Sequence, residues 1–299
     1  MREVTFEDYR ARILAVLVFI QQHLDEALAL EELAAVAHFS PFHFHRVFRG
    51  LVGESVKEHV RRLRLERAAH QLRHTGQPIT ELALGAGYES LEAFSRAFHK
   101  LFGQTPTDYR LLRRMAAYGP AISGIHYVTE GALDDFRPAQ PHATPLTVRI
   151  ETLPEMRIAF IRHVGPYEQT DAAYAKLMGW AGRRGLLKQG TEVFGIAYDD
   201  PQVTAAERLR YDAALVVPSE VGPEGEISIQ TISGGKYAVA THQGPYETLG
   251  ETYARLCGEW IPHSGREVSP APALEFYRNT PTDTAPADLI TDIYMRLVV

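Results

Sequence analysis

A six-residue segment occurs twice in the second half of the chain, and this repeat is the strongest constraint on its fold. His163–Glu168 reads HVGPYE, and His242–Glu247 reads HQGPYE 79 residues later. Similar offsets pair further residues: Tyr174 with Tyr253, Leu177 with Leu256, Tyr198 with Tyr277 and, at 80 residues, Asp212 with Asp292. Self-similarity at a fixed period marks a structural repeat. The second half is therefore predicted to contain two copies of one unit.

Each copy is predicted to be a strand, a helix and two further strands. Alternating apolar residues predict strands at 148–153, 157–163, 193–198, 211–217, 227–232, 237–242, 273–278 and 292–299. Helical spacing predicts helices at 169–184 and 248–261. The expected fold is an α+β C-terminal domain of two tandem βαββ repeats with pseudo-twofold symmetry. Such a domain would leave a cleft between the two helices and the sheet.

The first part of the chain reads as all-helical, and it is also duplicated. Two sets of residues match at offsets of 49 and 50: Leu33, Ala34, Ala37, Phe44, Arg46, Phe48 and Gly53 with Leu82, Ala83, Ala86, Phe94, Arg96, Phe98 and Gly103. Each copy is a short helix, a tight turn and a second helix, which is the form of a helix-turn-helix. The predicted helices are 9–24, 30–37, 41–51, 55–73, 79–86, 90–102 and 106–115.

Residues 116–145 contain four prolines and three glycines with little periodicity, which predicts an interdomain linker. The chain is thus expected to be a multidomain protein. Its parts are an all-α domain with two helix-turn-helix units at 1–115, a linker at 116–145 and the α+β domain at 146–299.

Charge is divided between these parts. The whole chain has a net charge of −6, but 41–114 holds 13 Lys and Arg against 7 Asp and Glu, and 116–299 holds 15 against 23. The longest apolar run, 13–20, is too short to cross a membrane, which needs about 20 residues. With one cysteine, no zinc spacing and no phosphate loop, we expect no internal disulfide, metal or cofactor, no membrane partner and a cytoplasmic location.

The second helix of each helix-turn-helix unit can present a polar face to a DNA major groove while phenylalanines fix its back. The two faces contain Phe42, His45, Arg46 and Arg49 in the first unit, and Leu91, Glu92, Ser95, Arg96, His99 and Lys100 in the second. Further positive charge for phosphates is expected from Lys57, Arg61, Arg62, Arg64 and Arg67. The alternative is a helical bundle whose arginines form an ordinary solvated face, but the duplicated pattern favours DNA.

Residues 30–110 resemble the DNA-binding domain of the AraC/XylS family of transcriptional regulators. The residues that carry the resemblance lie in and directly after the second helix-turn-helix unit: Ile79–Ala83, Gly87–Ser90, Phe94–Phe98, Gly103–Pro106 and Tyr109–Arg110. The resemblance implies a reader of double-stranded DNA with one helix in each of two adjacent major grooves. It places Phe42, His45, Arg46, Leu91, Glu92, Ser95 and Arg96 against bases. The first helix departs from many members in its Phe and His content, so its base preference stays open.

Residues 146–299 resemble a gyrase-inhibitor-like (GyrI-like) effector-binding domain, through the two GPYE units, 274–278 and 291–294. The domain order is similar to that of Rob-type regulators, which implies a non-enzymatic transcription regulator with a small, apolar or cationic effector. RNA polymerase is a further candidate partner. The resemblance places Glu275 against the effector, and alternation along the strand points it away from Leu274 and Phe276.

Aromatic residues near the repeated strands and helices are the other candidates for lining this site: Tyr167, Tyr246, Tyr198, Tyr277, Trp180 and Trp260. For most of them core packing is the alternative, and Tyr167 and Tyr246 fit a structural role in the turn equally well. Two other functions stay open. The domain could hydrolyse its ligand with Glu275 as general base, or it could bind a protein.

Overall fold

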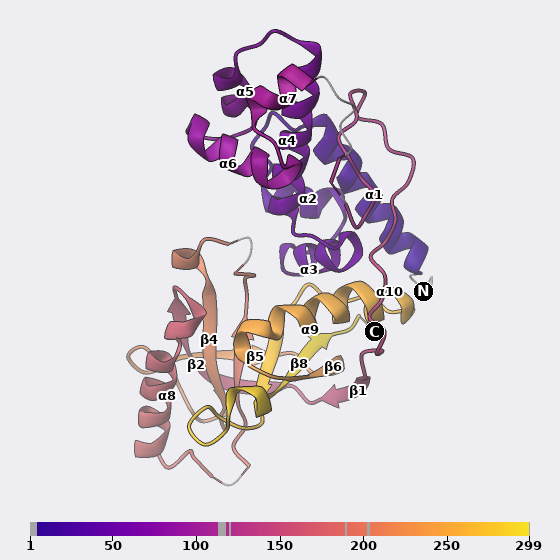
Figure 1. The fold of residues 1–299 in the computed structure, drawn as a ribbon. Coiled ribbons are helices and arrows are strands. Elements are labelled where there is room, and N and C mark those ends of the chain that lie inside the picture. Colours follow the sequence, from indigo (N-terminus) through magenta and orange to yellow (C-terminus); the bar gives the residue numbers. More distant parts are fainter. Residues whose placement is uncertain (1–4, 113–117, 120, 189, 202–203, 299) are drawn as a thin grey trace. The chain divides into compact units, whose positions relative to one another are not determined.

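The computed structural model describes residues 5–112, 118–119, 121–188, 190–201 and 204–298, without the side chains of Phe42 and Leu112 (Figure 1). The chain divides into a helical unit, Glu7–Gln140, and a second unit that includes Pro141–Val299. In the described residues, no helix combines the length and apolar character needed to traverse a bilayer.

The helical unit contains seven described helices at the places that the sequence predicts. They are α1 (Phe6–Gln22), α2 (Leu30–Val36), α3 (Pro41–Val52), α4 (Val56–His74), α5 (Ile79–Gly85), α6 (Leu91–Phe102) and α7 (Pro106–Leu112). The end of the last predicted helix, 113–115, lies outside the described residues. Local sequence explains the other boundaries. Ser55 and Glu58 form a capping box at the start of α4, and Gly53 and Gly103 end α3 and α6 in the left-handed conformation.

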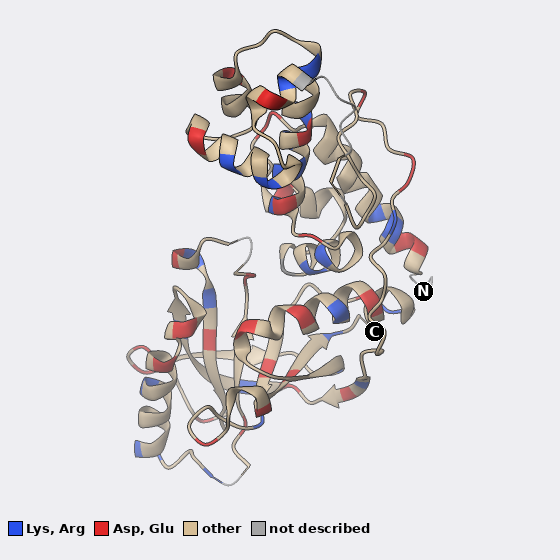
Figure 2. Ribbon diagram, in the orientation of Figure 1, with Lys and Arg blue, Asp and Glu red and all other residues tan. Residues whose placement is uncertain are grey.

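α4 joins two small helical modules, one made of α2 and α3 and the other of α5 and α6. Its residues Leu65 and Leu72 share a core with Phe94 and Phe98 of α6. α4 and α6 carry both Lys or Arg and Asp or Glu, whereas α3 carries arginine and no acidic residue (Figure 2).

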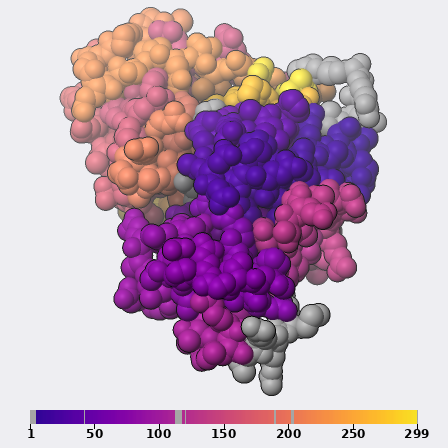
Figure 3. All heavy atoms as spheres, turned by 90° about the horizontal axis from the view of Figure 1, so that it is seen from above, coloured from indigo at the N-terminus to yellow at the C-terminus, as the bar shows by residue number. Residues whose placement is uncertain are grey.

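Most of the predicted linker packs onto the helical unit. Ser123, Ile125 and Phe136 are buried, and the amide of Arg137 donates to the carbonyl of Ser123, which closes a loop. We call residues 121–139 the strap. The amide of Ala139 donates to the carbonyl of Leu51 in α3, and the magenta strap lies against the indigo first helices in Figure 3.

The second unit is built on one antiparallel sheet with strand order β1-β6-β8-β7-β3-β4-β2-β5 (Figure 1). The strands are β1 (Val148–Leu153), β2 (Met156–Val164), β3 (Val193–Ala197), β4 (Arg210–Val216), β5 (Ser228–Ile232), β6 (Gly235–Gln243), β7 (Ala273–Tyr277) and β8 (Ile290–Arg296). β1 pairs with β6, and β5 pairs with β2, all antiparallel.

The helices of this unit are α8 (Asp171–Arg183), α9 (Leu249–Arg255) and the short α10 (Ile261–His263), with a π-helical turn at Leu256–Trp260. α8 packs on β2 and β4, and α9 packs on β6, on the sheet face that carries Ala213 and Glu275. The opposite face has a separate core that includes Phe194, Ile196, Leu274 and Phe276. This two-faced packing places Glu275 under the helices.

Candidate functional sites

α6 presents a polar face of the kind that the sequence predicts for DNA contact. Phe94 and Phe98 are fully buried against α4. The exposed residues of α6 are Leu91, Glu92, Arg96, His99 and Lys100, and Ser95 is half-buried. The hydroxyl of Ser90 accepts a hydrogen bond from the amide of Ala93, which fixes the N-terminus of the helix. α6 therefore has an anchored back and a solvated front.

α3 has an anchored back of the same kind, because Phe44 and Phe48 are fully buried and their ring centroids lie 5.8 Å apart. The side chain of Phe42 lies outside the described part. The base contacts assigned to Phe42, His45 and Arg46, and the contact assigned to Arg49, stay predictions.

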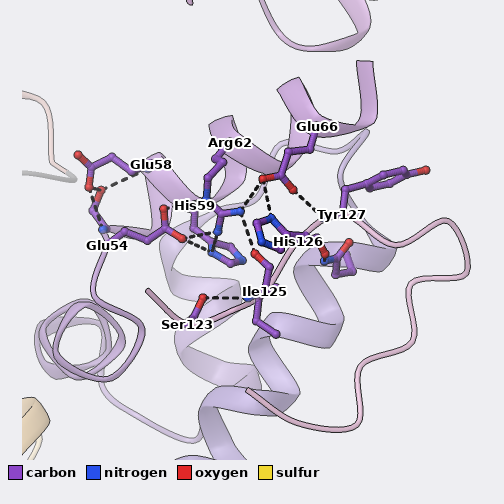
Figure 4. A network of polar contacts seen from close by, with 11 residues as sticks. Glu54, Glu58, His59, Arg62, Glu66, Ser123, Ile125, His126 and Tyr127 are labelled. Atoms are coloured by element: carbon purple, nitrogen blue, oxygen red, sulfur yellow. Dashed lines mark hydrogen bonds and ion pairs between the residues drawn. The ribbon is translucent and has the colours of Figure 1, made fainter. Parts of the chain in front are cut away.

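Three of the arginines expected to face phosphates are used inside the helical unit. Arg64 donates to the carbonyls of Leu24 and Glu26, and Arg67 pairs with Asp25. Arg62 is buried, and it lies at the centre of the network drawn in Figure 4.

This network joins α4 to the strap. Arg62 donates to Glu54 and, at 3.0 Å, to Glu66, and its Nη1 also donates to the carbonyl of Ile125 at 2.8 Å (Figure 4). Glu66 is fully buried and accepts a hydrogen bond from the amide of Tyr127 at 2.8 Å. Burial opposes the charge on Glu54, but hydrogen bonds from His59 and Arg62 outweigh it and lower its pKa to about 2. These contacts hold the strap on α4.

In the second unit, Glu275 lies at the centre of the sheet. It is 5% exposed and stands directly opposite Gly195 where β7 pairs with β3. Tyr253 of α9 donates to Oε1 of Glu275 at 2.8 Å, and Tyr277 donates to Oε2 at 2.8 Å. No Lys, Arg or His among the described residues forms an ion pair with this carboxylate.

Two further tyrosines extend this arrangement. The hydroxyl of Tyr211 hydrogen-bonds to that of Tyr277, and the hydroxyl of Tyr174 in α8 lies 2.9 Å from that of Tyr211. Glu275 with Tyr174, Tyr211, Tyr253 and Tyr277 is named the tyrosine cluster below. Burial, and then the charge of Glu275, raises the pKa of Tyr277 well above its ordinary value. Burial also raises the pKa of Tyr211 and of Tyr174, so these hydroxyls stay protonated at neutral pH.

Tyr246 and Tyr167 flank the cluster. The ring of Tyr246 lies 5.3 Å from that of Tyr277, and the ring of Tyr167 lies 5.5 Å from that of Tyr211. The hydroxyl of Tyr167 also donates to the carbonyl of Asp199 at 2.8 Å, which ties its turn to the end of β3. Tyr167 therefore has a structural contact as well as a place beside the cluster.

The structure places Tyr198 on the sheet face opposite to that of Glu275, so Tyr198 does not line the tyrosine cluster as the sequence predicts. Its hydroxyl donates to Asp212 at 2.9 Å, and the guanidinium of Arg162 lies 4.7 Å from its ring. Phe194 and Ile196 share a face with Leu274 and Phe276, so equivalent positions in β3 and β7 are 80 residues apart. The predicted match of Tyr198 with Tyr277 was therefore one residue out of register, which turns a side chain to the other face.

The two tryptophans lie apart from the tyrosine cluster. Trp180 belongs to the core between α8 and the sheet, and its ring N–H donates to Glu224 at 2.6 Å. Trp260 is half-buried in the π-helical turn and shares no hydrogen bond or ring contact with the cluster in the part of the chain described. A cavity of about 230 Å³ lies elsewhere, lined by Pro145, Leu146, Thr147, Arg149, Thr241 and Arg255.

Sequence reasoning missed Gly195, Tyr174, Tyr211 and Tyr253 as members of the site. Tyr174 and Tyr253 are matched residues of the repeat, so their equivalence was a signal that both helices direct a tyrosine to the same place. Tyr211 and Gly195 carry no such signal. Among the described residues, no group of His, Cys, Asp and Glu is arranged to hold a metal ion.

Comparison with known proteins gives two family matches. Residues 146–298 match the GyrI-like small molecule binding domain, and residues 33–111 match a helix-turn-helix domain. The transcriptional regulator Rob of Salmonella typhimurium is 38% identical over 104 residues, which are 35% of this chain and 36% of that protein. The chain thus matches about a third of the length of this relative.

Two further similar proteins each align with about half of this chain. The probable transcriptional regulator YgiV of Escherichia coli is 32% identical over 155 residues, which are 51% of this chain and 96% of that protein. The crystal structure of the EcmrR C-terminal domain aligns with a TM-score of 0.42 at 19% identity, over 51% of this chain and 98% of that one.

Proposed function

Because the chain belongs to the family with the GyrI-like small molecule binding domain, and an AraC-type helix-turn-helix domain precedes it, we propose that it is a transcription regulator. In this proposal the helical unit binds a specific double-stranded DNA site in the cytoplasm. The second unit, built as two related repeats, binds a small organic effector that changes the regulator's output. We propose RNA polymerase as a further partner of the protein.

The observation that carries the effector site is the carboxylate of Glu275, which is buried and accepts hydrogen bonds from two tyrosines, with no ion pair to a Lys, Arg or His of the described residues. A buried carboxylate costs free energy unless hydrogen bonds or a cation compensate it. Aromatic rings attract cations as well, and Tyr246 and Tyr167 stand beside the cluster. A small organic cation therefore fits the charge and the rings of this place.

DNA binding is supported by the exposed front of α6. Arg96 occupies it, and an arginine there can make a bidentate contact to guanine in the major groove. The base-facing set is Leu91, Glu92, Ser95 and Arg96 in α6, with Phe42, His45 and Arg46 in α3 and phosphate contacts from Arg49, His99 and Lys100.

A mobility-shift assay on the DNA upstream of the protein's own gene tests this function. Arg96→Ala and Arg46→Ala should each weaken binding by about tenfold to a hundredfold, the value of one bidentate contact. Lys188→Ala, an exposed residue of the second unit, is the control. If both arginine variants keep the affinity and the sequence preference of the parent, the assignment of the reading helices is wrong.

Hydrolysis by the second unit is a weaker alternative. Each oxygen of Glu275 already accepts a hydrogen bond from a tyrosine, so its use as a base would require one tyrosine to leave. Binding of a protein in place of a metabolite is the other alternative. Turnover of a bound compound that stops in Glu275→Gln would support hydrolysis, and an unchanged compound after long incubation would count against it.

A further inference from the structure

Both ends of the strap lie at the C-terminal end of α3. At one end, the side chain of Ile122 fills the space beside Gly53, where a Cβ would come within 2.7 Å of it. At the other end, the amide of Ala139 donates to the carbonyl of Leu51 at 2.7 Å. Between these ends, the hydrogen bonds to α4 described above hold the loop in place. The strap is therefore attached to the first of the two helices proposed to contact bases.

Directly after the strap, the chain is attached to α9 and to the π-helical turn that follows it. The carboxylate of Glu259 in this turn hydrogen-bonds to the amide of His142, at 3.2 Å, and to the ring of the same residue. Arg255 of α9 donates to the carbonyl of Thr144 and pairs with Glu259 at 3.5 Å. We call His142, Thr144, Arg255 and Glu259 the clamp. All four belong to the second unit, so the clamp fixes the start of that unit to α9.

The connection between the attachment on α3 and the clamp is short and stiff. Only Gln140 and Pro141 separate Ala139 from the first residue of the clamp. Prolines occupy three of the nine positions 137–145, and residues 132–164 contain no glycine. Proline fixes its own φ angle and restricts the residue before it, so a proline-rich connection acts as a semi-rigid spacer. A displacement of the clamp is therefore passed on to Ala139 and is not absorbed by the connection.

The clamp and the proposed effector site share α9. Tyr253, which donates to Glu275 at 2.8 Å, precedes Arg255 of the clamp by two residues. α9 continues directly into the π-helical turn that carries Glu259. Hydrogen bonds between successive turns make a helix move as one body. An effector that displaces Tyr253 from Glu275 would therefore also shift the two residues of the clamp that α9 and its turn provide.

We infer that residues 121–144 couple the effector site to α3: when an effector moves α9, the clamp pulls on Ala139 and changes the position of the end of α3. The inference rests on the proposed function and specifies how it is regulated. Neither family match includes residues 112–145, so the coupling is a property of this connecting segment and not of either domain family. Coupling between two binding sites is reciprocal, so DNA bound by α3 must in turn change the clamp.

Reciprocity allows a test with DNA as the only probe. Amide hydrogen exchange of the full chain is measured with and without a saturating amount of the DNA upstream of its own gene. DNA should change the exchange rates of residues 139–144 and 249–260 at least about fivefold, the lower end of an allosteric coupling. Inserting Gly-Ser-Gly-Ser between Gln140 and Pro141 keeps the contacts at both ends but makes the connection flexible. This insertion should abolish the change at 249–260 and leave DNA binding in place.

Two further variants complete the test. The same four residues inserted between Pro281 and Thr282, both exposed, are the matched control and should leave the change at 249–260 intact. Glu259→Ala removes the acceptor for His142 without altering the length of the connection. It should speed exchange at 139–144 in the free protein and reduce the effect of DNA at 249–260 by at least about half, because the clamp is only partly kept.

The outcomes separate the coupling from the function beneath it. If the parent binds this DNA and exchange at 249–260 does not change, the coupling is overturned while DNA binding stands. A change that persists with the flexible insertion, or in full in Glu259→Ala, also overturns the inference, because the signal then takes another route. If the parent does not bind the DNA at all, the proposed function and the coupling both fail.

Discussion

The hydroxyl of Tyr211 occupies the space above Gly195, where a Cβ would lie 1.7 Å from it. Gly195 faces Glu275 across the β3–β7 pair, so the missing side chain makes room for the tyrosine that continues the hydrogen-bond chain. A strand glycine often marks a close approach of this kind. The tyrosine cluster thus depends on the absence of a side chain at position 195.

Gly195→Ala should therefore displace Tyr211 and destabilise the second unit by at least about 1–3 kcal/mol, the usual cost of overpacking. The measurement is urea unfolding of the full chain. In Tyr211→Ala the same glycine substitution should cost much less, because the clashing ring is gone. Gly179→Ala is the matched control, since its Cβ would come no closer than 3.6 Å to another atom. Additive losses in the double variant would contradict the steric explanation.

Lys100 tests the electrostatic part of DNA binding. It is exposed in the last turn of α6, beyond the residues assigned to bases. Lys100→Ala should weaken binding to specific and unrelated DNA alike. It should also reduce the slope of log affinity against log salt by about one, because one phosphate contact is lost. Mobility shifts at several salt concentrations measure this slope. A change in sequence preference without a change in slope would place Lys100 at a base.

The regular elements of this chain could be predicted because local patterns decide them. Periodic apolar residues fixed the helices and strands to within a few residues, and alternation placed Glu275 opposite to Leu274 and Phe276. The error at Tyr198 shows the limit of such patterns. A repeat can be matched at two offsets that differ by one residue, and only packing shows which face a strand residue takes.

The rest of the site needed three-dimensional contacts. Tyr211 joins the cluster because Gly195, 16 positions earlier, lies beside it in the sheet, and no local pattern connects the two. The strap was read as a linker because its prolines and glycines show no period. Its attachment comes from single polar contacts, such as the amide of Tyr127 to Glu66, which composition does not reveal.

Glu66 tests the attachment of the strap. Glu66→Gln removes the buried charge beside Arg62 and turns an amide NH₂ toward other donors. Because Arg62 keeps Glu54, the loss should lie near the lower end of the about 3–5 kcal/mol found for a broken buried pair. In limited proteolysis, the strap should then be cleaved faster in Glu66→Gln than in the parent protein. Glu89→Gln, an exposed residue of the same unit, should change neither the stability nor the cleavage rate.

His59 makes the helical unit sensitive to acid. It is fully buried, and burial lowers its pKa below the ordinary value of 6.5, despite the opposing hydrogen bond to Glu54. Below pH 6.5 the unfolded chain therefore binds a proton that the folded chain excludes, so stability falls as the pH falls. From pH 6.5 to 5 this histidine alone costs up to about 2 kcal/mol. Glu54 adds a further loss as the pH falls from 4.5 toward 2, because its folded pKa lies below its unfolded one.

His59→Gln should therefore lose less stability between pH 7.5 and pH 5 than the parent does, by up to about 2 kcal/mol, although it starts from a lower value because the contact with Glu54 is weakened. Urea unfolding of the full chain at both pH values measures the difference. His99→Gln, an exposed residue of α6, is the control and should leave the loss unchanged. An equal loss in the parent and in His59→Gln would assign the acid sensitivity to other groups, of which buried His43, with its pKa lowered to about 3 by burial and by Arg46, is the first to test.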